Sequence, residues 1–271
     1  MGEDLAGRIA LVTGGAHGVG RAVVDQLAER GAHVVINYLR AGAAAQQALR
    51  ELADRGLSAE LLRCSVARQD QVGRMFETVA ARHGRLDILV NNAASGAFGM
   101  LGDLTDKDWT RALDTNLRGT LWCSQQGAAL MPEGGAIVNL SSLGAGTAPP
   151  GYAAVGTSKA AVEALTRYLA VEYAPRGVRV NAASAGPLDG DAVRQYAPRA
   201  SAWETMRAAT PLGRFGTERE LAGVVVFLAS PAASWITGQV IVADGGLSLM
   251  AAPFAGAVAP AAVNGAVHEH A

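Results

Sequence analysis

The chain has little of what disulfide-stabilised or nucleic-acid-binding proteins need. It holds only two cysteines, Cys64 and Cys123, each inside an apolar segment. Two such thiols form neither a disulfide framework nor a metal-ligand cluster, so we predict reduced, buried thiols in a cytoplasmic protein. The 271 residues include 23 Lys and Arg against 24 Asp and Glu, a net charge of −1. Because this balance provides no basic field, we expect no nucleic-acid partner.

Long apolar runs are missing as well. No stretch of about 18 residues is free of polar interruption, so we expect no membrane-spanning helix and no membrane partner. Residues 1–7 carry two acids and no apolar run, which argues against a signal peptide. Hydrophobic residues nevertheless make up 50% of the chain and charged residues 17%, so the chain can bury a large core.

What the chain does contain is an alternation of short apolar runs with longer segments of helical periodicity. Such runs, bounded by glycine or polar residues, predict strands buried on both faces of a sheet. Their alternation with helices predicts an α/β fold, a doubly wound parallel sheet of about seven strands with helices on both faces. The predicted strands are residues 9–13, 33–38, 59–64, 86–90, 136–140, 178–182 and 239–243, and the predicted helices are residues 19–30, 43–55, 69–83, 106–131, 152–174 and 218–229.

The alternation is interrupted once, between the sixth and seventh predicted strands. Residues 187–215 form the one long irregular insertion, with three prolines. An insertion after the carboxyl end of a strand predicts a lid over a ligand site, with a tolerated surface loop as the alternative. We therefore expect one domain over residues 1–250 that includes this lid.

The end of the chain has a different composition. Residues 251–271 are rich in alanine, proline and glycine without periodicity, which predicts a disordered tail. The tail contains His268, Glu269 and His270, but a frayed terminus does not hold ligands in fixed positions. We therefore expect no metal site.

A glycine-rich loop follows the first predicted strand and opens the first helix. Gly14, Gly18 and Gly20 allow a tight turn and a close approach to a pyrophosphate, which the helix N-terminus attracts. His17 and Val19 lie in the same loop and are expected to contact the nucleotide. Because the loop has this strand–helix context, it predicts dinucleotide binding.

The end of the second predicted strand indicates which nucleotide is bound. NAD sites place an acid about 20 residues past the glycines, to hold the ribose hydroxyls. Here the chain has Tyr38 and Arg40 and no acid. Arg40 and His17 would instead face a 2′-phosphate, although a solvated Arg40 is the alternative. The predicted cofactor is therefore NADPH.

Several motifs in order along residues 5–249 resemble the short-chain dehydrogenase/reductase superfamily. The resemblance implies a Rossmann-type fold, a nicotinamide cofactor and a homotetramer built through the two longest helices and the C-terminal segment. The motifs are the glycine loop, Asn91-Asn92-Ala93-Ala94, Asn116, Ser141-Ser142, Lys159-Ala160-Ala161 and Asp244-Gly245-Gly246.

The catalytic motif departs from the ordinary Tyr-x-x-x-Lys of that superfamily. Val155 stands four residues before Lys159, and Tyr152 stands seven residues before it. Seven helical residues turn by about 700°, so both side chains can line one face of a helix. The Tyr-x6-Lys spacing, with the sequence around it, resembles the NADPH-dependent enoyl-acyl-carrier-protein reductase III type.

A chemical reason accompanies the shifted tyrosine. An enoyl thioester accepts hydride at Cβ, so negative charge develops on the thioester oxygen, two carbons away. A shift of three residues moves the tyrosine by about 4.5 Å along a helix. Tyr152 is thus expected to donate to the developing enolate oxygen, with a ring that merely packs at the helix start as the alternative.

Three further residues complete the expected catalytic set. Lys159 is expected to hydrogen-bond the nicotinamide ribose and to ease deprotonation of Tyr152, with a surface lysine as the alternative. Ser142 matches the superfamily's substrate-binding serine, or it caps a strand end. Asn116 matches the asparagine that braces the active-site lysine through water, or it makes a local helix hydrogen bond.

The resemblance also implies cofactor contacts from loops farther along the chain. Ser65 replaces the usual acid beside adenine, Ala185-Gly186-Pro187 departs from the usual Pro-Gly, and Gly190 stands where a threonine is common. The last two departures weaken the expected grip on the nicotinamide end. The contacts expected from these loops are Ser65, Val66, Asn92, Ala93, Gly186 and Leu188.

Three functions follow from these features. The main prediction is NADPH-dependent reduction of the carbon–carbon double bond of an enoyl thioester, carried by acyl-carrier protein or CoA, in fatty-acid or secondary-metabolite biosynthesis. The second is 3-oxoacyl or other carbonyl reduction that also uses Tyr152. The third, suggested by Val155 and Gly190, is a nucleotide-binding scaffold without chemistry. The acyl chain, linear, cyclic or polyketide-derived, is left open.

Overall fold

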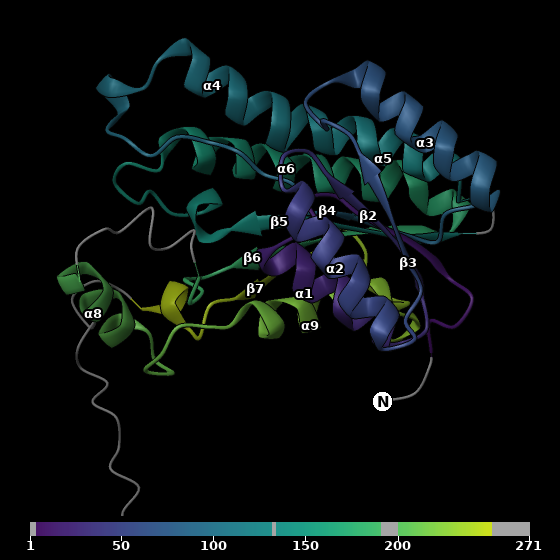
Figure 1. The fold of residues 1–271 in the computed structure, drawn as a ribbon. Helices are drawn as coiled ribbons and strands as arrows, with labels where there is room; N and C mark the ends of the chain where they lie inside the picture. The colour runs from purple at the N-terminus through teal and green to yellow at the C-terminus, as the bar shows by residue number, and fades with distance from the viewer. Residues whose placement is uncertain (1–3, 132–133, 191–199, 251–271) are drawn as a thin grey trace, which may run out of the picture.

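A computed structural model describes residues 4–131, 134–190 and 200–250. Seven strands form one parallel sheet in the order β3-β2-β1-β4-β5-β6-β7, which confirms the predicted α/β fold (Figure 1). The chain order reverses at β1, which pairs with β2 on one side and β4 on the other. The strands are β1 Ile9–Val12, β2 His33–Tyr38, β3 Ala59–Arg63, β4 Ile88–Asn91, β5 Gly135–Ser142, β6 Val178–Ala185 and β7 Val240–Ala243.

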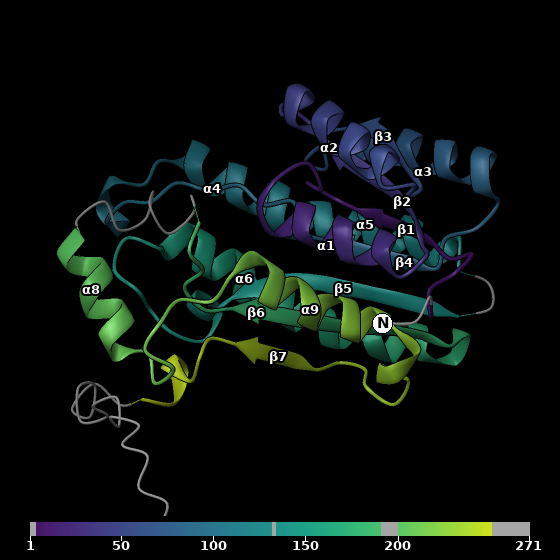
Figure 2. The same cartoon turned by 60° about the horizontal axis from the view of Figure 1, so that its bottom comes forward.

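Helices cover both faces of the sheet (Figure 2). Successive residues of a strand point to opposite faces, so β1 places Val12 in the core beneath α1 and α9 and Leu11 in the core beneath α3, α5 and α6. Two apolar layers therefore sandwich the sheet. The helices are α1 Gly18–Glu29, α2 Gly42–Asp54, α3 Gln69–His83, α4 Asp106–Ala112, α5 Gly119–Ala129, α6 Ala153–Tyr173, α8 Ala200–Ala209 and α9 Glu218–Ala229.

The outer strands correct one expectation. The sequence predicts seven strands buried on both faces, but every residue of β3 and β7 keeps some exposure. Val242 of β7 is 47% exposed. A strand at the edge of a sheet has a neighbour on one side only, so composition alone overstated the burial of these two.

The predicted helix over residues 106–131 is also interrupted. Between α4 and α5 lies a π-helical segment, Leu113–Arg118, and Asn116 is in it. Single π-turns widen a helix locally and are frequent at functional sites. Sequence periodicity does not distinguish this local widening from a continuous α-helix.

The expected lid is only partly irregular. Helix α8 occupies Ala200–Ala209 within it and lies at the end of the molecule toward which β5, β6 and β7 run (Figure 1). Alanine, methionine and glutamate favour a helix there, although the prolines and glycines around it are typical of irregular segments. Residues 191–199, and the predicted tail at 251–271, lie outside the described residues.

Both thiols are buried and unpaired, as predicted. Burial raises the pKa of Cys64 to about 11 and raises the pKa of Cys123 as well. Both therefore stay in the unreactive thiol form at neutral pH.

None of the helices in the described part of the chain combines the length and apolar character needed to cross a membrane.

Candidate active site

The predicted site residues gather at the carboxyl edge of the sheet. The glycine loop follows β1, Asn92 and Ala93 follow β4, and Ser142 ends β5. Parallel sheets bind ligands at this edge, where the strand order reverses. The fold thus brings segments far apart in sequence to one place.

Steric constraints on the backbone explain the glycine loop. Gly14 and Gly18 have φ values of 63° and 59°, in the left-handed region that favours glycine. A Cβ on Gly20 would lie 2.3 Å from the Gly14 carbonyl oxygen and 2.5 Å from Nδ2 of Asn92. Only glycine at position 20 lets helix α1 approach the loop this closely.

Polar side chains that the sequence analysis did not single out hold this loop. Thr13 Oγ1 accepts hydrogen bonds from the backbone N–H groups of Asn92 and Ala93, both at 3.0 Å. Asn37 Oδ1 accepts from the Gly14 N–H at 3.3 Å, and its Nδ2 donates to the Cys64 carbonyl at 3.1 Å. A buried asparagine inside an otherwise apolar strand was the available signal for Asn37.

Asn92 does more than the expected cofactor contact. Its Nδ2 donates to the carbonyl oxygens of Thr13 and Gly14, at 2.9 and 3.1 Å. The end of β4 is thereby joined to the start of the glycine loop. Asn92 is thus a positioning residue for the loop, while its own contact with a cofactor stays a prediction.

The N-terminus of α1 fits a pyrophosphate. His17 takes the N-cap position with extended backbone and an exposed ring, and its side chain makes no capping hydrogen bond. No acid lies in the first turn of this 12-residue helix. An uncapped helix start with glycines around it offers N–H donors and a positive dipole end to an anion.

The adenosine end of the expected site contains no carboxylate among residues 37–40. Tyr38 is half-buried at the end of β2, and Arg40 is exposed in the bend that follows. Val66 is buried after β3, and the adjacent Ser65 N–H donates to Gln71 Oε1 at 2.9 Å. This arrangement fits a nucleotide with a 2′-phosphate better than one with two ribose hydroxyls.

The nicotinamide end of the site is shaped by the segment after β6. A Cβ on Gly186 would lie 2.5 Å from Cα of Asp244, so the two backbones pack directly together. Leu188 pairs with Gly216 and packs against the core. Oε1 of Glu218 lies 3.1 Å from the Cβ position of Gly190, so there is little room there for the usual threonine.

Tyr152 lies immediately before α6 and not within it. Tyr152 is the N-cap of α6, with a φ of −111°. The turn of about 700° expected between two helical residues seven apart therefore does not give its position relative to Lys159. Its hydroxyl donates to Ser142 Oγ at 3.4 Å, and its ring stacks on Phe98 with centroids 5.6 Å apart. Gly144 makes this possible, because a Cβ there would lie 2.5 Å from the Tyr152 ring.

Val155 fills the position of the ordinary tyrosine. It is 8% exposed, and its Cγ2 lies 2.3 Å from where a Cβ on Gly96 would stand. A valine and a glycine thus pack together where the superfamily usually places a phenol. The phenol of this motif is therefore that of Tyr152, seven residues before Lys159.

Lys159 is buried and has a backbone partner. Its Nζ donates to the Leu140 carbonyl at 2.6 Å, and burial lowers its pKa from 10.5 to about 8. Burial raises the pKa of Tyr152, and the hydrogen bond to Ser142 only partly opposes this rise. The expectation that Tyr152 is eased toward deprotonation is therefore wrong for this structure, which keeps a protonated donor.

Asn116 joins two parts of the site. Its Oδ1 accepts from the Ser95 N–H at 2.8 Å, and its Nδ2 donates to the Ser95 carbonyl at 2.9 Å and to Ser158 Oγ at 2.8 Å. These long-range bonds replace the local helix hydrogen bond considered as an alternative. Asn116 thus fixes the loop after β4 to the residue before Lys159, while bracing through water stays a prediction.

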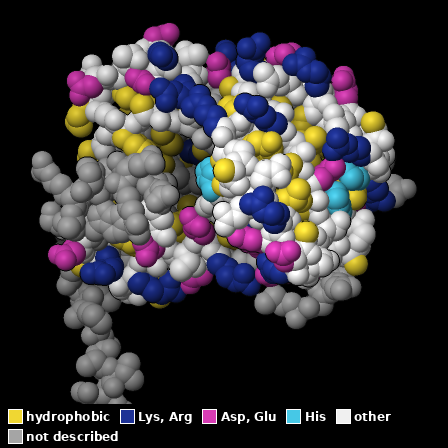
Figure 3. Space-filling model, in the orientation of Figure 1, with side chains coloured by type: hydrophobic (Ala, Val, Ile, Leu, Met, Phe, Trp, Pro, Cys, Tyr) yellow, Lys and Arg dark blue, Asp and Glu magenta, His cyan; other side chains and the backbone are white. Residues whose placement is uncertain are grey.

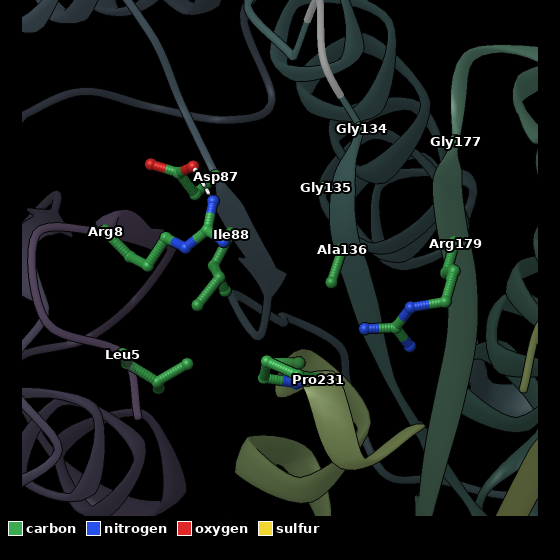
Figure 4. A pocket seen from close by; sticks show the side chains of 11 residues that line it. Leu5, Arg8, Asp87, Ile88, Gly134, Gly135, Ala136, Gly177, Arg179 and Pro231 are labelled. Atoms are coloured by element: carbon green, nitrogen blue, oxygen red, sulfur yellow. Dashed lines mark hydrogen bonds and ion pairs between the residues drawn. The ribbon is translucent and has the colours of Figure 1, made fainter. Parts of the chain in front are cut away.

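A cavity of about 240 Å³ lies elsewhere (Figure 4). Ile88, Ala136 and Arg179 line it at the amino ends of β4, β5 and β6, and Arg8 pairs with Asp87 at its edge. Arg179 donates to the carbonyls of Leu228 and Ser230. This cavity is at the edge of the sheet opposite the glycine loop and contains none of the predicted site residues.

Comparisons with known proteins show the family to which the chain belongs. A family profile described as enoyl-(acyl carrier protein) reductase matches residues 14–248. A 1-cyclohexenylcarbonyl-CoA reductase from Streptomyces collinus is 39% identical over 91% of this chain and 89% of that protein. A 3-oxoacyl-[acyl-carrier-protein] reductase, FabG, from Staphylococcus aureus is 37% identical over 88% of this chain and 97% of its own.

Solved structures are similar too. A gluconate 5-dehydrogenase from Burkholderia cenocepacia, in complex with NADP and tartrate, superposes with a TM-score of 0.87 at 33% identity, over 91% of this chain and 97% of its own. A blue fluorescent protein from a metagenomic library, in complex with NADPH, superposes with a TM-score of 0.85 at 34% identity, over 90% of this chain and 99% of its own. The chain therefore belongs to the short-chain dehydrogenase/reductase superfamily, in the family whose profile bears the enoyl reductase description.

Proposed function

We propose that the protein reduces the carbon–carbon double bond of an enoyl thioester with NADPH. One observation carries this proposal: the partly buried phenol of Tyr152 stands seven residues before Lys159, while the buried Val155 occupies the four-residue position. An oxidoreductase of this superfamily is shown by the comparisons. The choice of an enoyl substrate is the proposal.

NADPH would be held along the carboxyl edge of the sheet. The uncapped start of α1, Gly14 and Gly18 would face the pyrophosphate, and Arg40 the 2′-phosphate. When bound, this cofactor supplies the hydride. The relatives described as NADP and NADPH complexes support the assignment.

The chain's own residues would stabilise the charge that develops on the substrate. When hydride reaches Cβ of the enoyl thioester, negative charge grows on the thioester oxygen, and the resulting enolate takes a proton from water at Cα to give the saturated thioester. Tyr152 remains a neutral donor at that oxygen, since burial raises the pKa of its hydroxyl. Ser142 Oγ accepts a hydrogen bond from the phenol in this structure and thereby orients the hydroxyl before substrate arrives.

Carbonyl reduction is the second candidate function. The hydroxyls of Tyr152 and Ser142 lie 3.4 Å apart, so both can point to one carbonyl oxygen. The FabG relative is described as a 3-oxoacyl reductase. A catalytically silent scaffold is the third alternative.

The experiment that separates these functions follows NADPH oxidation with paired substrates. We expect kcat/KM for enoyl-CoA thioesters, crotonyl-CoA and 1-cyclohexenylcarbonyl-CoA, to exceed that for acetoacetyl-CoA by about tenfold or more, since only the former match the donor position. The same pairs on acyl-carrier protein test the carrier. Faster turnover of the 3-oxoacyl thioester would replace the proposal with carbonyl reduction, and NADPH binding without turnover would favour the scaffold.

The 2′-phosphate assignment gives a second expected result. Arg40→Ala should weaken NADPH binding by about 1.5–3 kcal/mol, the range for hydrogen bonds to charged groups, and leave NADH binding almost unchanged. Titration of both nucleotides by intrinsic fluorescence measures this. Arg50→Ala, an exposed arginine on α2, is the matched control. Equal losses for both nucleotides would contradict the assignment.

A homotetramer is also part of the proposal. On α6, Tyr168 and Val171 are 71% and 76% exposed, and Trp235, just before β7, is 99% exposed. Large apolar side chains on a long helix and beside an edge strand support burial against further copies of the chain.

A further inference from the structure

A cluster of two histidines and one glutamate lies at the opposite edge of the sheet from the glycine loop. His33 begins β2, Glu60 is in β3, and His83 ends α3. One ring nitrogen of each histidine and one carboxylate oxygen of Glu60 lie within 4.8 Å of one another. Histidine side chains gather on that side of the molecule beside β3 and α3 (Figure 3).

One ring nitrogen of His33 lacks a hydrogen-bond partner in the described residues, which points to a ligand. Its Nδ1 lies 2.6 Å from Ser58 Oγ, which fixes the ring. Its Nε2 is buried and has no hydrogen-bond partner in the described part of the chain. Buried polar atoms without partners are rare and costly, so an unseen partner such as an ion is a physical explanation.

The other two side chains are held in a manner that suits metal ligands. His83 Nε2 lies 2.9 Å from Glu60 Oε1, while Arg82 donates to Glu60 Oε2 at 2.6 Å. The two rings have centroids 4.9 Å apart. Ser58 and Arg82 thus act on the ring and the carboxylate from outside, as the supporting partners of metal ligands do.

We propose that His33, Glu60 and His83 bind a divalent transition-metal ion, Zn²⁺ in the first place. His33 would coordinate through Nε2, His83 through a ring nitrogen and Glu60 through Oε1, with water as the fourth ligand. Ligand atoms of tetrahedral zinc lie about 3.4 Å apart at the usual bond lengths of about 2.0–2.1 Å, so small side-chain rotations suffice. Two imidazoles and a carboxylate favour Zn²⁺ over Mg²⁺ or Ca²⁺, which take oxygen ligands.

Such an ion would join β2, β3 and α3. Strand β3 is the last strand of the sheet and pairs with β2 alone, so the ion would add a second link to it. A metal that binds the folded chain but not the unfolded chain raises the free energy of unfolding by RT ln(1 + c/Kd), where c is the free metal concentration. The ion would hold these three elements together, and enoyl reduction would not depend on it.

The test uses the full-length untagged protein with His268→Gln and His270→Gln, because the histidines of the tail could bind metal themselves. After treatment with chelator and dialysis against Zn²⁺, we expect one zinc ion per chain and a higher Tm. His33→Gln, Glu60→Gln and His83→Gln should each weaken zinc binding about tenfold or more in competition with a chromophoric chelator, since the site has only three protein ligands. Glu77→Gln, an exposed acid on α3, should leave binding unchanged.

Co²⁺ provides a measurement that does not depend on the folding of a variant. In the parent protein Co²⁺ should give the intense visible absorption of a tetrahedral site, and Zn²⁺ should displace it. Absence of saturable Zn²⁺ and Co²⁺ binding to the parent would overturn the proposal. It would also be overturned if the His33→Gln and His83→Gln variants bound zinc as tightly as the parent does. Enoyl reduction should be the same with and without zinc, so this test and that of the proposed function fail independently.

Discussion

We expect Tyr152→Phe to lower kcat for enoyl reduction by about 10²–10³, the usual loss when one oxyanion donor is removed. The ring keeps its stacking on Phe98 and its packing over Gly144, so the fold and the glycine loop are unchanged. Binding of NADPH should therefore change little. Steady-state kinetics with the best enoyl-CoA substrate and a nucleotide titration measure the two quantities separately.

Tyr168→Phe is the matched control for this variant. Tyr168 lies on α6, the helix that Tyr152 precedes, and is 71% exposed in the single chain. Removal of its hydroxyl should leave kcat unchanged. If Tyr152→Phe retained full enoyl activity, the phenol would be dispensable and the donor assignment would be wrong.

The second large effect concerns Lys159, where function and stability should change in opposite directions. Lys159→Met should lower kcat/KM by about 10² or more and weaken NADPH binding, because the cation expected to hold the nicotinamide ribose is lost. The same change should raise the free energy of unfolding at pH 7 by roughly 1–3 kcal/mol. The reason is that burial disfavours the charged ammonium, whose pKa falls to about 8, whereas methionine fills a similar volume without charge.

The pH dependence of this stabilisation has a definite sign. Below pH 8 the lysine is protonated in both the folded and the unfolded chain, so the folded chain bears the full cost of the buried charge. Between about pH 8 and 10.5 the unfolded chain binds more protons than the folded chain, so the stability of the wild type rises with pH. The advantage of Lys159→Met should therefore be greatest below pH 8 and shrink toward pH 10.5.

Urea denaturation at pH 7 and pH 9.5 measures this change. Lys107→Met is the control, because Lys107 is the only other lysine of the chain and is exposed on α4. Its effect on stability should be small, because its side chain is exposed. A stabilisation by Lys159→Met that is the same at both pH values would contradict the depressed pKa.

Local sequence patterns were sufficient for the elements and for the nucleotide loop. Strand and helix periods are properties of neighbouring residues, so the alternation predicted all seven strands and the order of the main helices. Gly14 and Gly18 were also locally readable, since positive φ values restrict the choice of residue. The burial of β3 and β7 was not readable, because it depends on which strands occupy the edges of the sheet.

The site was predictable only in its outline. The spacing of Tyr152, Val155 and Lys159 can be read in the sequence, but the residues that make room for them lie outside this motif. Gly96 accommodates Val155, and Gly144 accommodates the ring of Tyr152. Such contacts join segments across the fold and leave no periodic signal.

The sequence by itself therefore determined the parallel α/β architecture, the glycine loop and the displaced tyrosine, because each follows from backbone sterics or from spacing within one element. Only the tertiary structure decided that Asn116 bonds to Ser95 and Ser158 from a π-turn, and that burial raises the pKa of Tyr152. It also brought together His33, Glu60 and His83. The physical reason is that desolvation and long-range hydrogen bonds depend on which surfaces meet when the helices pack against the sheet.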